Sequence, residues 1–97
     1  MTVSRDRLAG MPVVILRAPL KDLAGGNREV QLEGPDVRSV VRALEAGWPK
    51  TAGWVLDDQG RVRQHVNVFL NGERVREDAV VEPDDTLHIL ASITGGS

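Results

Sequence analysis

The spacing of apolar and polar residues predicts a hairpin near the start of the chain. Residues 13–18 form an aliphatic run rich in β-branched side chains and closed by Pro19, which is typical of a buried strand. After a glycine-containing turn, residues 28–33 alternate strictly, with Val30 and Leu32 on one face. We expect these two runs to pair with each other.

A single helix is predicted next. Gly34-Pro35 ends the second strand, and Asp36 suits the N-cap because its carboxylate can accept free amide protons. Apolar residues then recur at helical spacing, and Gly47 with Pro49 ends the pattern. The apolar stripe consists of Val37, Val40, Val41 and Leu44.

The region after this helix predicts a loop. Residues 48–60 show no clear period, so we expect a long loop that Trp48 and Trp54 partly anchor.

The rest of the chain predicts three more strands. Residues 66–70 alternate, Asn71-Gly72 is a strong hairpin signal, and residues 73–76 supply the return strand. Val80 and Val81 suggest a short edge segment, and residues 86–91 form the last alternating strand after a Pro-Asp-Asp turn.

This order of elements predicts an α+β fold of the β-grasp, ubiquitin-like type. A mixed sheet of four to five strands would pack on one main helix. We expect a flexible leader over residues 1–11, the β-grasp domain over 12–91 and a flexible tail over 92–97.

Composition narrows the possible functions. A chain of 97 residues holds one domain, and its net charge of −2 argues against nucleic acid and anionic membranes as partners. The absence of cysteine excludes disulfides, thiol nucleophiles and cysteine-based metal sites. No apolar run is long enough for a membrane span or a signal peptide, so a cytoplasmic protein is expected.

Groups for catalysis are scarce in this sequence. His65 and His88 both fall at alternating positions opposite the apolar set, and no second histidine follows at metal-binding spacing. No Gly-x-Ser-x-Gly motif occurs. The pairs Asp57-Asp58 and Asp84-Asp85 stand beside turn residues, where aspartate commonly closes a turn. We therefore expect neither an enzyme nor a metal site.

A partner-binding surface is predicted on the sheet. If Val66 and Val68 face the helix, a period of two places Phe69 on the opposite face, and the same count on the last strand places His88 and Leu90 there. An exposed Phe beside an exposed Leu indicates a docking patch.

Four arginines near the second hairpin are the other surface candidate. They could form a basic patch, but acidic residues lie among them, which favours a charged, soluble hairpin edge. The arginines are Arg61, Arg63, Arg74 and Arg76, and the acids are Glu73, Glu77 and Asp78.

The carboxyl end is the most informative segment. Thr94-Gly95-Gly96 follows the last strand, and two glycines make a tail thin enough for a narrow enzyme channel. With the element order, the run HVNVFLNG over 65–72 and the run DDTLHILASITGG over 84–96, the chain resembles the MoaD/ThiS family of bacterial ubiquitin-like sulfur carriers. The 65–72 run looks most like the members that feed cysteine or secondary-metabolite sulfur assembly.

The resemblance implies a carrier that is itself acted upon. A MoeB/ThiF-type activating enzyme would use ATP to adenylate the Gly96 carboxylate, and a sulfur donor would displace AMP to leave a thiocarboxylate. A sulfur-accepting biosynthetic enzyme would then take the sulfur. The chain itself would bind no cofactor.

Ser97 departs from the family pattern because it follows Gly96. It would be either an extension that a JAMM-type metallopeptidase removes or an added residue. Two alternatives remain open: a ubiquitin-like modifier or interaction module conjugated through Gly96, and the small subunit of a molybdopterin synthase.

Overall fold

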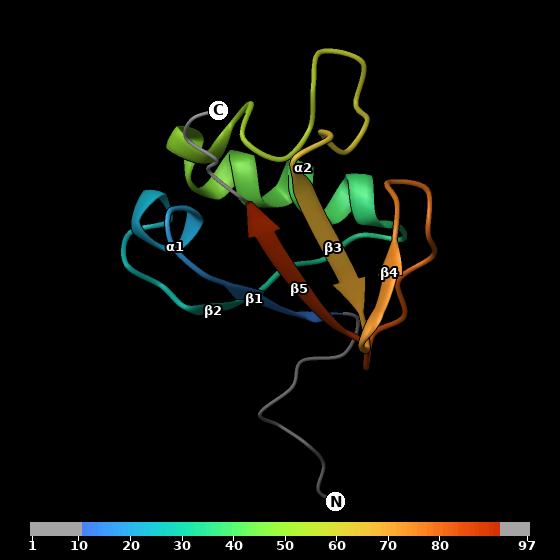
Figure 1. The fold of residues 1–97 in the computed structure, drawn as a ribbon. Coiled ribbons are helices and arrows are strands. Elements are labelled where there is room, and N and C mark those ends of the chain that lie inside the picture. Colours follow the sequence, from blue (N-terminus) through green and yellow to red (C-terminus); the bar gives the residue numbers. More distant parts are fainter. Residues whose placement is uncertain (1–10, 92–97) are drawn as a thin grey trace, which may run out of the picture.

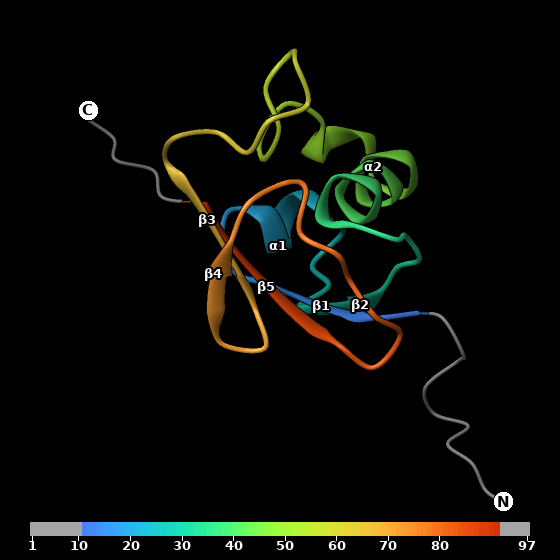
Figure 2. The ribbon, with the colours of Figure 1, turned by 90° about the vertical axis from the view of Figure 1, so that its right-hand side faces the viewer.

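The computed structural model describes residues 11–91, which form a five-stranded mixed sheet covered on one face by one main helix (Figures 1 and 2). The strands are β1 (Val13–Leu16), β2 (Glu29–Gln31), β3 (Val66–Leu70), β4 (Glu73–Val75) and β5 (Thr86–Ala91). The helices are α1 (Leu20–Leu23), α2 (Val37–Gly47) and the short 3₁₀ helix η1 (Pro49–Thr51). The α+β, β-grasp prediction is confirmed.

The sheet has the strand order β2-β1-β5-β3-β4. The central strand β5 runs parallel to β1 and antiparallel to β3, while the two hairpins place β2 and β4 at the edges. Both predicted hairpins are therefore present, and the strand that precedes the Gly-Gly tail is paired on both sides.

Helix α2 begins as the sequence predicts. The Oδ1 atom of Asp36 accepts a hydrogen bond from the backbone N–H of Ser39 at 2.8 Å, and this bond holds the pKa of the Asp36 carboxyl below its usual value. All four residues of the apolar stripe are fully buried against the sheet: Val37, Val40, Val41 and Leu44. Since the stripe fills the core, α2 fixes which sheet face is inner.

The turn of the second hairpin also has the predicted geometry. Asn71 and Gly72 both have positive φ, at 51° and 90°, which matches the twist of the flanking strands. The Asn71 side chain donates to Asp85 Oδ1 at 2.8 Å and accepts from Thr86 N at 2.9 Å. It thereby ties this turn to the start of β5.

Two connections differ from the sequence prediction. The β1–β2 connection contains the one-turn helix α1, whose Leu20 is fully buried, in addition to Gly25 and Gly26 with positive φ. A four-residue helix is too short to produce a periodic signal.

The loop predicted over residues 48–60 begins with the 3₁₀ helix η1, and the segment 52–65 that follows has different anchors from those predicted. Val55, Leu56 and Val62 are buried in the core, and Leu56 pairs with Val62 across a tight turn. Trp48 packs against the core as expected, but Trp54 is 38% exposed, so the prediction that it anchors the loop is wrong. Aliphatic side chains hold this segment.

Candidate docking surface and tail exit

The outer face of the sheet carries a row of five side chains, one from each strand, which we name the outer row. Its members, across the sheet from β2 to β4, are Glu29, Ile15, His88, Phe69 and Arg74. The row has an acidic end, an apolar stretch interrupted by one imidazole, and a basic end. Such a pattern suits recognition of a partner surface with matched charges.

The register of β3 and β5 places the predicted docking residues on this face. Val68, Leu87 and Ile89 are fully buried toward α2, whereas Phe69, His88 and Leu90 are half-buried at the intervening positions. His88 pairs with Phe69, and Leu90 is the diagonal neighbour of Phe69 on the same face. The structure thus brings the three side chains together; their role in docking stays a prediction.

Ile15 and Glu29 complete the row, although the sequence analysis did not select them. The run 13–18 was predicted to be a buried strand, and within it Ile15 is half-buried while Val14 and Leu16 are fully buried. A period of two within the run could have revealed this position, but its pairing with His88 depends on the parallel β1–β5 contact.

The predicted tail residues Thr94, Gly95, Gly96 and Ser97 lie outside the described residues. The described part of the chain ends at Ala91, the last residue of β5, which pairs with Val66 at the start of β3.

A pocket of about 670 Å³ lies beside the end of β5, and we name it the exit pocket. Its walls come from the 52–65 segment, the first residue of β3 and the last residue of β5. The lining side chains include Trp54, Arg63, Gln64, His65, Val66 and Ala91. Sequence reasoning missed this pocket because no periodicity connects residues 52–65 with β5.

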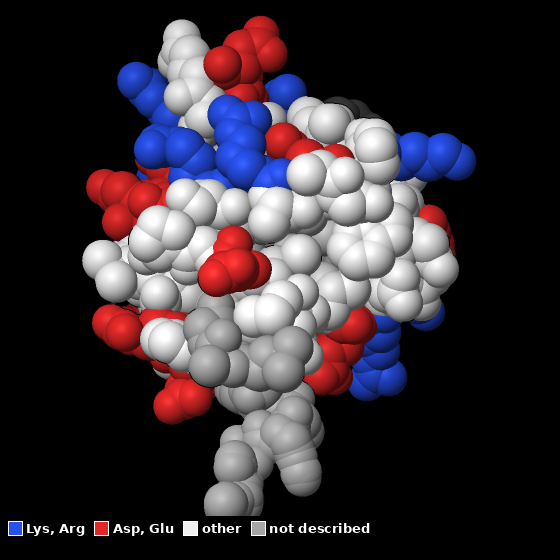
Figure 3. Space-filling view, turned by 180° about the vertical axis from the view of Figure 1, so that it is seen from behind, with Lys and Arg blue, Asp and Glu red and all other residues white. Residues whose placement is uncertain are grey.

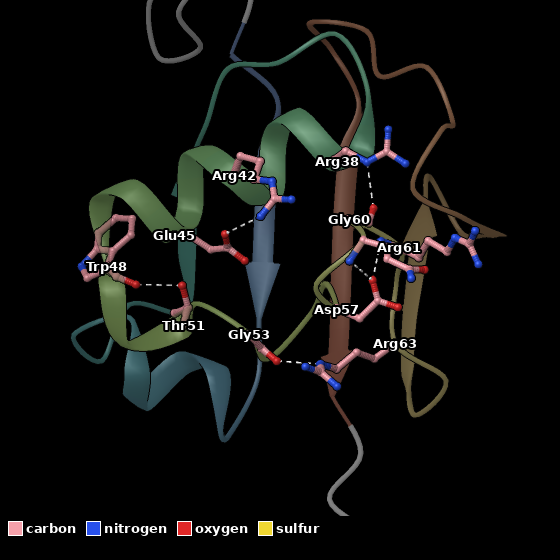
Figure 4. A network of polar contacts seen from close by, with 11 residues as sticks. Arg38, Arg42, Glu45, Trp48, Thr51, Gly53, Asp57, Gly60, Arg61 and Arg63 are labelled. Carbon is pink, nitrogen blue, oxygen red and sulfur yellow. Dashed lines mark hydrogen bonds and ion pairs between the residues drawn. The ribbon is translucent and has the colours of Figure 1, made fainter.

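Polar contacts hold the 52–65 segment in place (Figure 4). Arg38 of α2 donates from Nε to the Gly60 carbonyl at 2.7 Å, and Arg63 donates from Nε to the Gly53 carbonyl at 2.6 Å. Glu77 accepts from the backbone N–H of Val62 at 2.9 Å, and this bond lowers the pKa of its carboxyl. The segment is therefore clamped from both α2 and the region after β4.

One aspartate of each pair, Asp57 and Asp85, has the turn-closing role that the sequence predicts. Asp57 Oδ1 accepts backbone N–H groups of Arg61 at 3.0 Å and Gln59 at 2.8 Å, and the bond from Arg61 is the main cause of its lowered pKa. Asp85 Oδ2 accepts from Glu82 N at 2.7 Å. Among residues 11–91, no cluster of three or more histidine or acidic side chains could hold a metal ion.

The four arginines considered together in the sequence analysis lie in different parts of the fold. Arg74 is in β4 and Arg76 pairs with Glu77 at 3.4 Å, as expected of a charged hairpin edge. Arg61 and Arg63 belong instead to the 52–65 segment. Figure 3 shows basic side chains gathered on the helix side of the molecule, toward the end where this segment lies.

The fold and the central place of its last strand now define the class of protein. A mixed sheet that curves around one helix, with the chain leaving from the central strand, is the β-grasp, ubiquitin-like architecture. The chain belongs to the ThiS family, whose model matches residues 14–96 and so includes Gly95 and Gly96. The resemblance to MoaD/ThiS sulfur carriers is confirmed, and the family supports a sulfur-carrier or modifier role.

Solved structures give the same assignment. SAMP1 from Haloferax volcanii is 28% identical with a TM-score of 0.78, over 90% of this chain and 100% of that chain. A chain of the Amycolatopsis orientalis BexX/CysO complex is 25% identical with a TM-score of 0.78, over 87% of this chain and 98% of that chain. CysO of Mycobacterium tuberculosis, at 24% identity, a TM-score of 0.75 and coverage of 81% and 96%, shares the fold. No curated protein matches the sequence.

Within residues 11–91, no helix is both long enough and apolar enough to cross a bilayer.

Proposed function

We propose that this protein is a sulfur carrier that works through a thiocarboxylate on Gly96. The observation that carries the proposal is the ThiS family match, which extends from β1 through the whole domain to the Gly-Gly pair. The scarcity of catalytic side chains in the sequence agrees with a protein on which other enzymes act.

The proposed chemistry proceeds in two steps. A terminal carboxylate has a pKa of about 3.5, so it is ionised at neutral pH and has no good leaving group. In the first step a carboxylate oxygen of Gly96 attacks the α-phosphorus of ATP, and pyrophosphate leaves. In the second step hydrosulfide attacks the acyl carbon, the acyl C–O bond breaks so that AMP leaves with the oxygen, and the S–H proton passes to solvent. The carrier then holds sulfur as a thiocarboxylate for an acceptor enzyme.

We propose that the outer row and the neighbouring Leu90 bind the partners. Phe69 of β3 and Leu90 of β5 are diagonal neighbours, and β5 is the strand that leads into the tail. A MoeB/ThiF-type activating enzyme and the sulfur acceptor would use this face in turn. A solved complex that contains a CysO chain with BexX is consistent with such pairing in a similar protein.

Residue Ser97 is assigned to processing in this proposal. Because it follows Gly96, it would displace the reacting carboxylate by one residue, and a JAMM-type metallopeptidase would remove it before activation. The acceptor metabolite would belong to cysteine, cofactor or secondary-metabolite biosynthesis.

Intact mass spectrometry tests the proposed function. The chain ending at Gly96 is incubated with its activating enzyme, ATP and sulfide, and a gain of about 16 Da marks replacement of one oxygen by sulfur. A reaction without ATP is the control and should give no gain. If the ATP reaction leaves the mass unchanged, the sulfur-carrier function is wrong.

A second candidate function is conjugation to proteins through Gly96. The observation that favours it is the similarity to SAMP1, a small archaeal modifier protein, at 26–28% identity. In the same incubation with added cell protein, conjugation would give adducts of protein size. The chain has only Lys21 and Lys50, which leaves little scope for chains of linked copies.

A further inference from the structure

The exit pocket combines an exposed aromatic ring with a cation. Trp54 is 38% exposed and is one of two large hydrophobic residues exposed within residues 11–91. The Arg63 guanidinium and the exposed His65 lie in the same pocket. Tryptophan and arginine are the residue types most enriched at energetic centres of protein interfaces. The composition of the pocket therefore points to a protein ligand.

The pocket wall is ordered before any ligand binds. The bond from Arg63 Nε to the Gly53 carbonyl links the two ends of the 52–65 segment, and the bond from Arg38 Nε to the Gly60 carbonyl links its turn to α2 (Figure 4). Val55 and Leu56 anchor the same segment in the core. Binding to such a surface needs little additional ordering. With Nε engaged, the terminal nitrogens of Arg63 are the donors that a carboxylate would use.

The Arg63 guanidinium is the charged group of the pocket that an acidic partner would complement. Asp57 also lines the pocket, but its Oδ1 already accepts two backbone N–H groups. The ion pairs within the described residues are Arg42–Glu45 and Arg76–Glu77, and neither involves Arg63. An incoming carboxylate would thus complement Arg63 directly.

The position of the pocket identifies the partner. Gly96 stands five positions after Ala91, so even a fully extended tail places it within about 18 Å of the pocket rim. An enzyme that encloses the Gly96 carboxylate is wider than this distance. The region around Ala91 is therefore within reach of the enzyme surface that surrounds the entrance to its active site.

We propose that the exit pocket is a second docking site, which receives an acidic segment of the enzyme that adenylates Gly96. A carboxylate of this segment binds the Arg63 guanidinium, and a neighbouring apolar side chain covers Trp54. The site is separate from the outer row and rests on the proposed function, because that function supplies the enzyme.

Tryptophan fluorescence tests the docking site in the full chain. The variant Trp48→Phe leaves Trp54 as the only tryptophan. On adding the MoeB/ThiF-type enzyme of the same organism, with its own tryptophans subtracted, Trp54 emission should move to shorter wavelength and acrylamide quenching should fall. The mirror variant Trp54→Phe keeps Trp48 and should show neither change. If Trp54 emission and quenching stay constant while the complex forms, the proposal is overturned.

Charge variants test the acidic partner. Gln64→Glu adds a negative charge to the pocket without removing any recorded contact, and should weaken binding about tenfold at low salt. Arg63→Gln should weaken it similarly, and both effects should shrink in high salt. The matched control is Arg28→Gln, the same charge change at an exposed position before β2. Equal weakening by all three would indicate net charge alone and overturn the proposal.

Other occupants of the pocket give different results. If the chain's own residues fill the pocket, Trp54 resists acrylamide in the free protein and does not respond to the enzyme. If the site takes a small anion, ATP without enzyme changes Trp54 emission. Either result overturns the proposal. If the protein gains about 16 Da while Trp54 emission and quenching do not change, only the docking site is rejected. If the protein gains no mass, the sulfur-carrier function is rejected.

Discussion

Within β3 and within β5, residues that are neighbours in sequence have different roles, because successive side chains in a strand point to opposite faces of the sheet. One side chain packs in the core and the next lies on the outer face. Leu87 is fully buried toward α2, and its neighbour His88 lies on the outer face between Ile15 and Phe69. Changing one residue can therefore affect stability without affecting docking, or the reverse. Pairs of neighbouring substitutions separate the two effects.

Phe69→Ala should weaken binding to the activating enzyme while leaving the thermal midpoint nearly unchanged. Phe69 is half-buried on the outer face, and aromatic anchors of interfaces often contribute more than about 2 kcal/mol. Calorimetric titration and a thermal melt measure the two quantities. Leu87→Ala is the contrasting variant and should lose about 2–5 kcal/mol of unfolding free energy. A large loss of stability in Phe69→Ala would mean that Phe69 supports the core.

Glu77 should stabilise the fold in a pH-dependent manner. Its side chain is 13% exposed and accepts the Val62 N–H, which lowers its folded-state pKa. A lowered pKa gives stability that is complete above the unfolded value of about 4.3 and is lost as pH falls through the folded value. Glu77→Gln should thus cost about 1–2 kcal/mol at pH 7 and progressively less below pH 4.

Urea unfolding between pH 7 and pH 3 measures this difference. The control Glu73→Gln removes an exposed carboxylate of β4 and should follow the wild-type profile. A Glu77→Gln deficit that is constant with pH would contradict the carboxylate mechanism.

At the level of elements, the 52–65 segment depends on two arginine-to-carbonyl bonds and a tight turn. Gly60 has a φ of 76°, and its carbonyl accepts from Arg38. A Cβ at this position would lie 2.9 Å from Arg38 Nε, the atom that makes the bond. The turn therefore needs glycine for both its backbone angle and the close approach.

Gly60→Ala should destabilise the protein more than Gly53→Ala. Both glycines have positive φ, which costs an alanine on the order of 1–2 kcal/mol, but no atom lies within 4 Å of a Cβ at Gly53. The excess for Gly60 measures the clash with Arg38, and urea unfolding of both variants provides it. Equal losses would show that Arg38 moves aside freely.

The elements with strong local signals could be predicted from sequence. Asp36 with the stripe that starts at Val37 defines α2, and Asn71-Gly72 defines the second hairpin. The 52–65 segment could not be predicted because its anchors, Leu56 and Val62, meet only after the chain has turned. The outer face of β3 and β5 could be predicted by counting alternate residues along each strand. The exit pocket could not be predicted, because it depends on contacts between distant segments.

At the level of the whole molecule, removal of Ser97 should switch activation on. Adenylation places the terminal carboxylate at the α-phosphate of ATP, and a displacement of about 1 Å can cost on the order of a hundredfold in rate. The form ending at Gly96 should release pyrophosphate with the activating enzyme, and the form ending at Ser97 should be inert until a peptidase cuts the Gly96–Ser97 bond. Equal rates would contradict a processing role.

A methyl group at the end of the tail should also slow the reaction. Gly96→Ala in the trimmed chain adds a Cβ that restricts φ and meets the wall of a channel shaped for glycine. Pyrophosphate release should therefore fall even though the carboxylate is in the correct position. Unchanged release would mean that the channel is wider than proposed.

The parallel pairing of β1 with β5 has a mechanical consequence. β1 and β5 run in the same direction, so the chain enters the sheet beside Thr86 and leaves it beside Val66, at the opposite end (Figure 1). A pulling force between the two ends of the domain would load the hydrogen bonds on both sides of β5 together, in shear, instead of opening them one by one. An enzyme that draws the tail into its channel would therefore pull on a strand that is hydrogen-bonded on both sides.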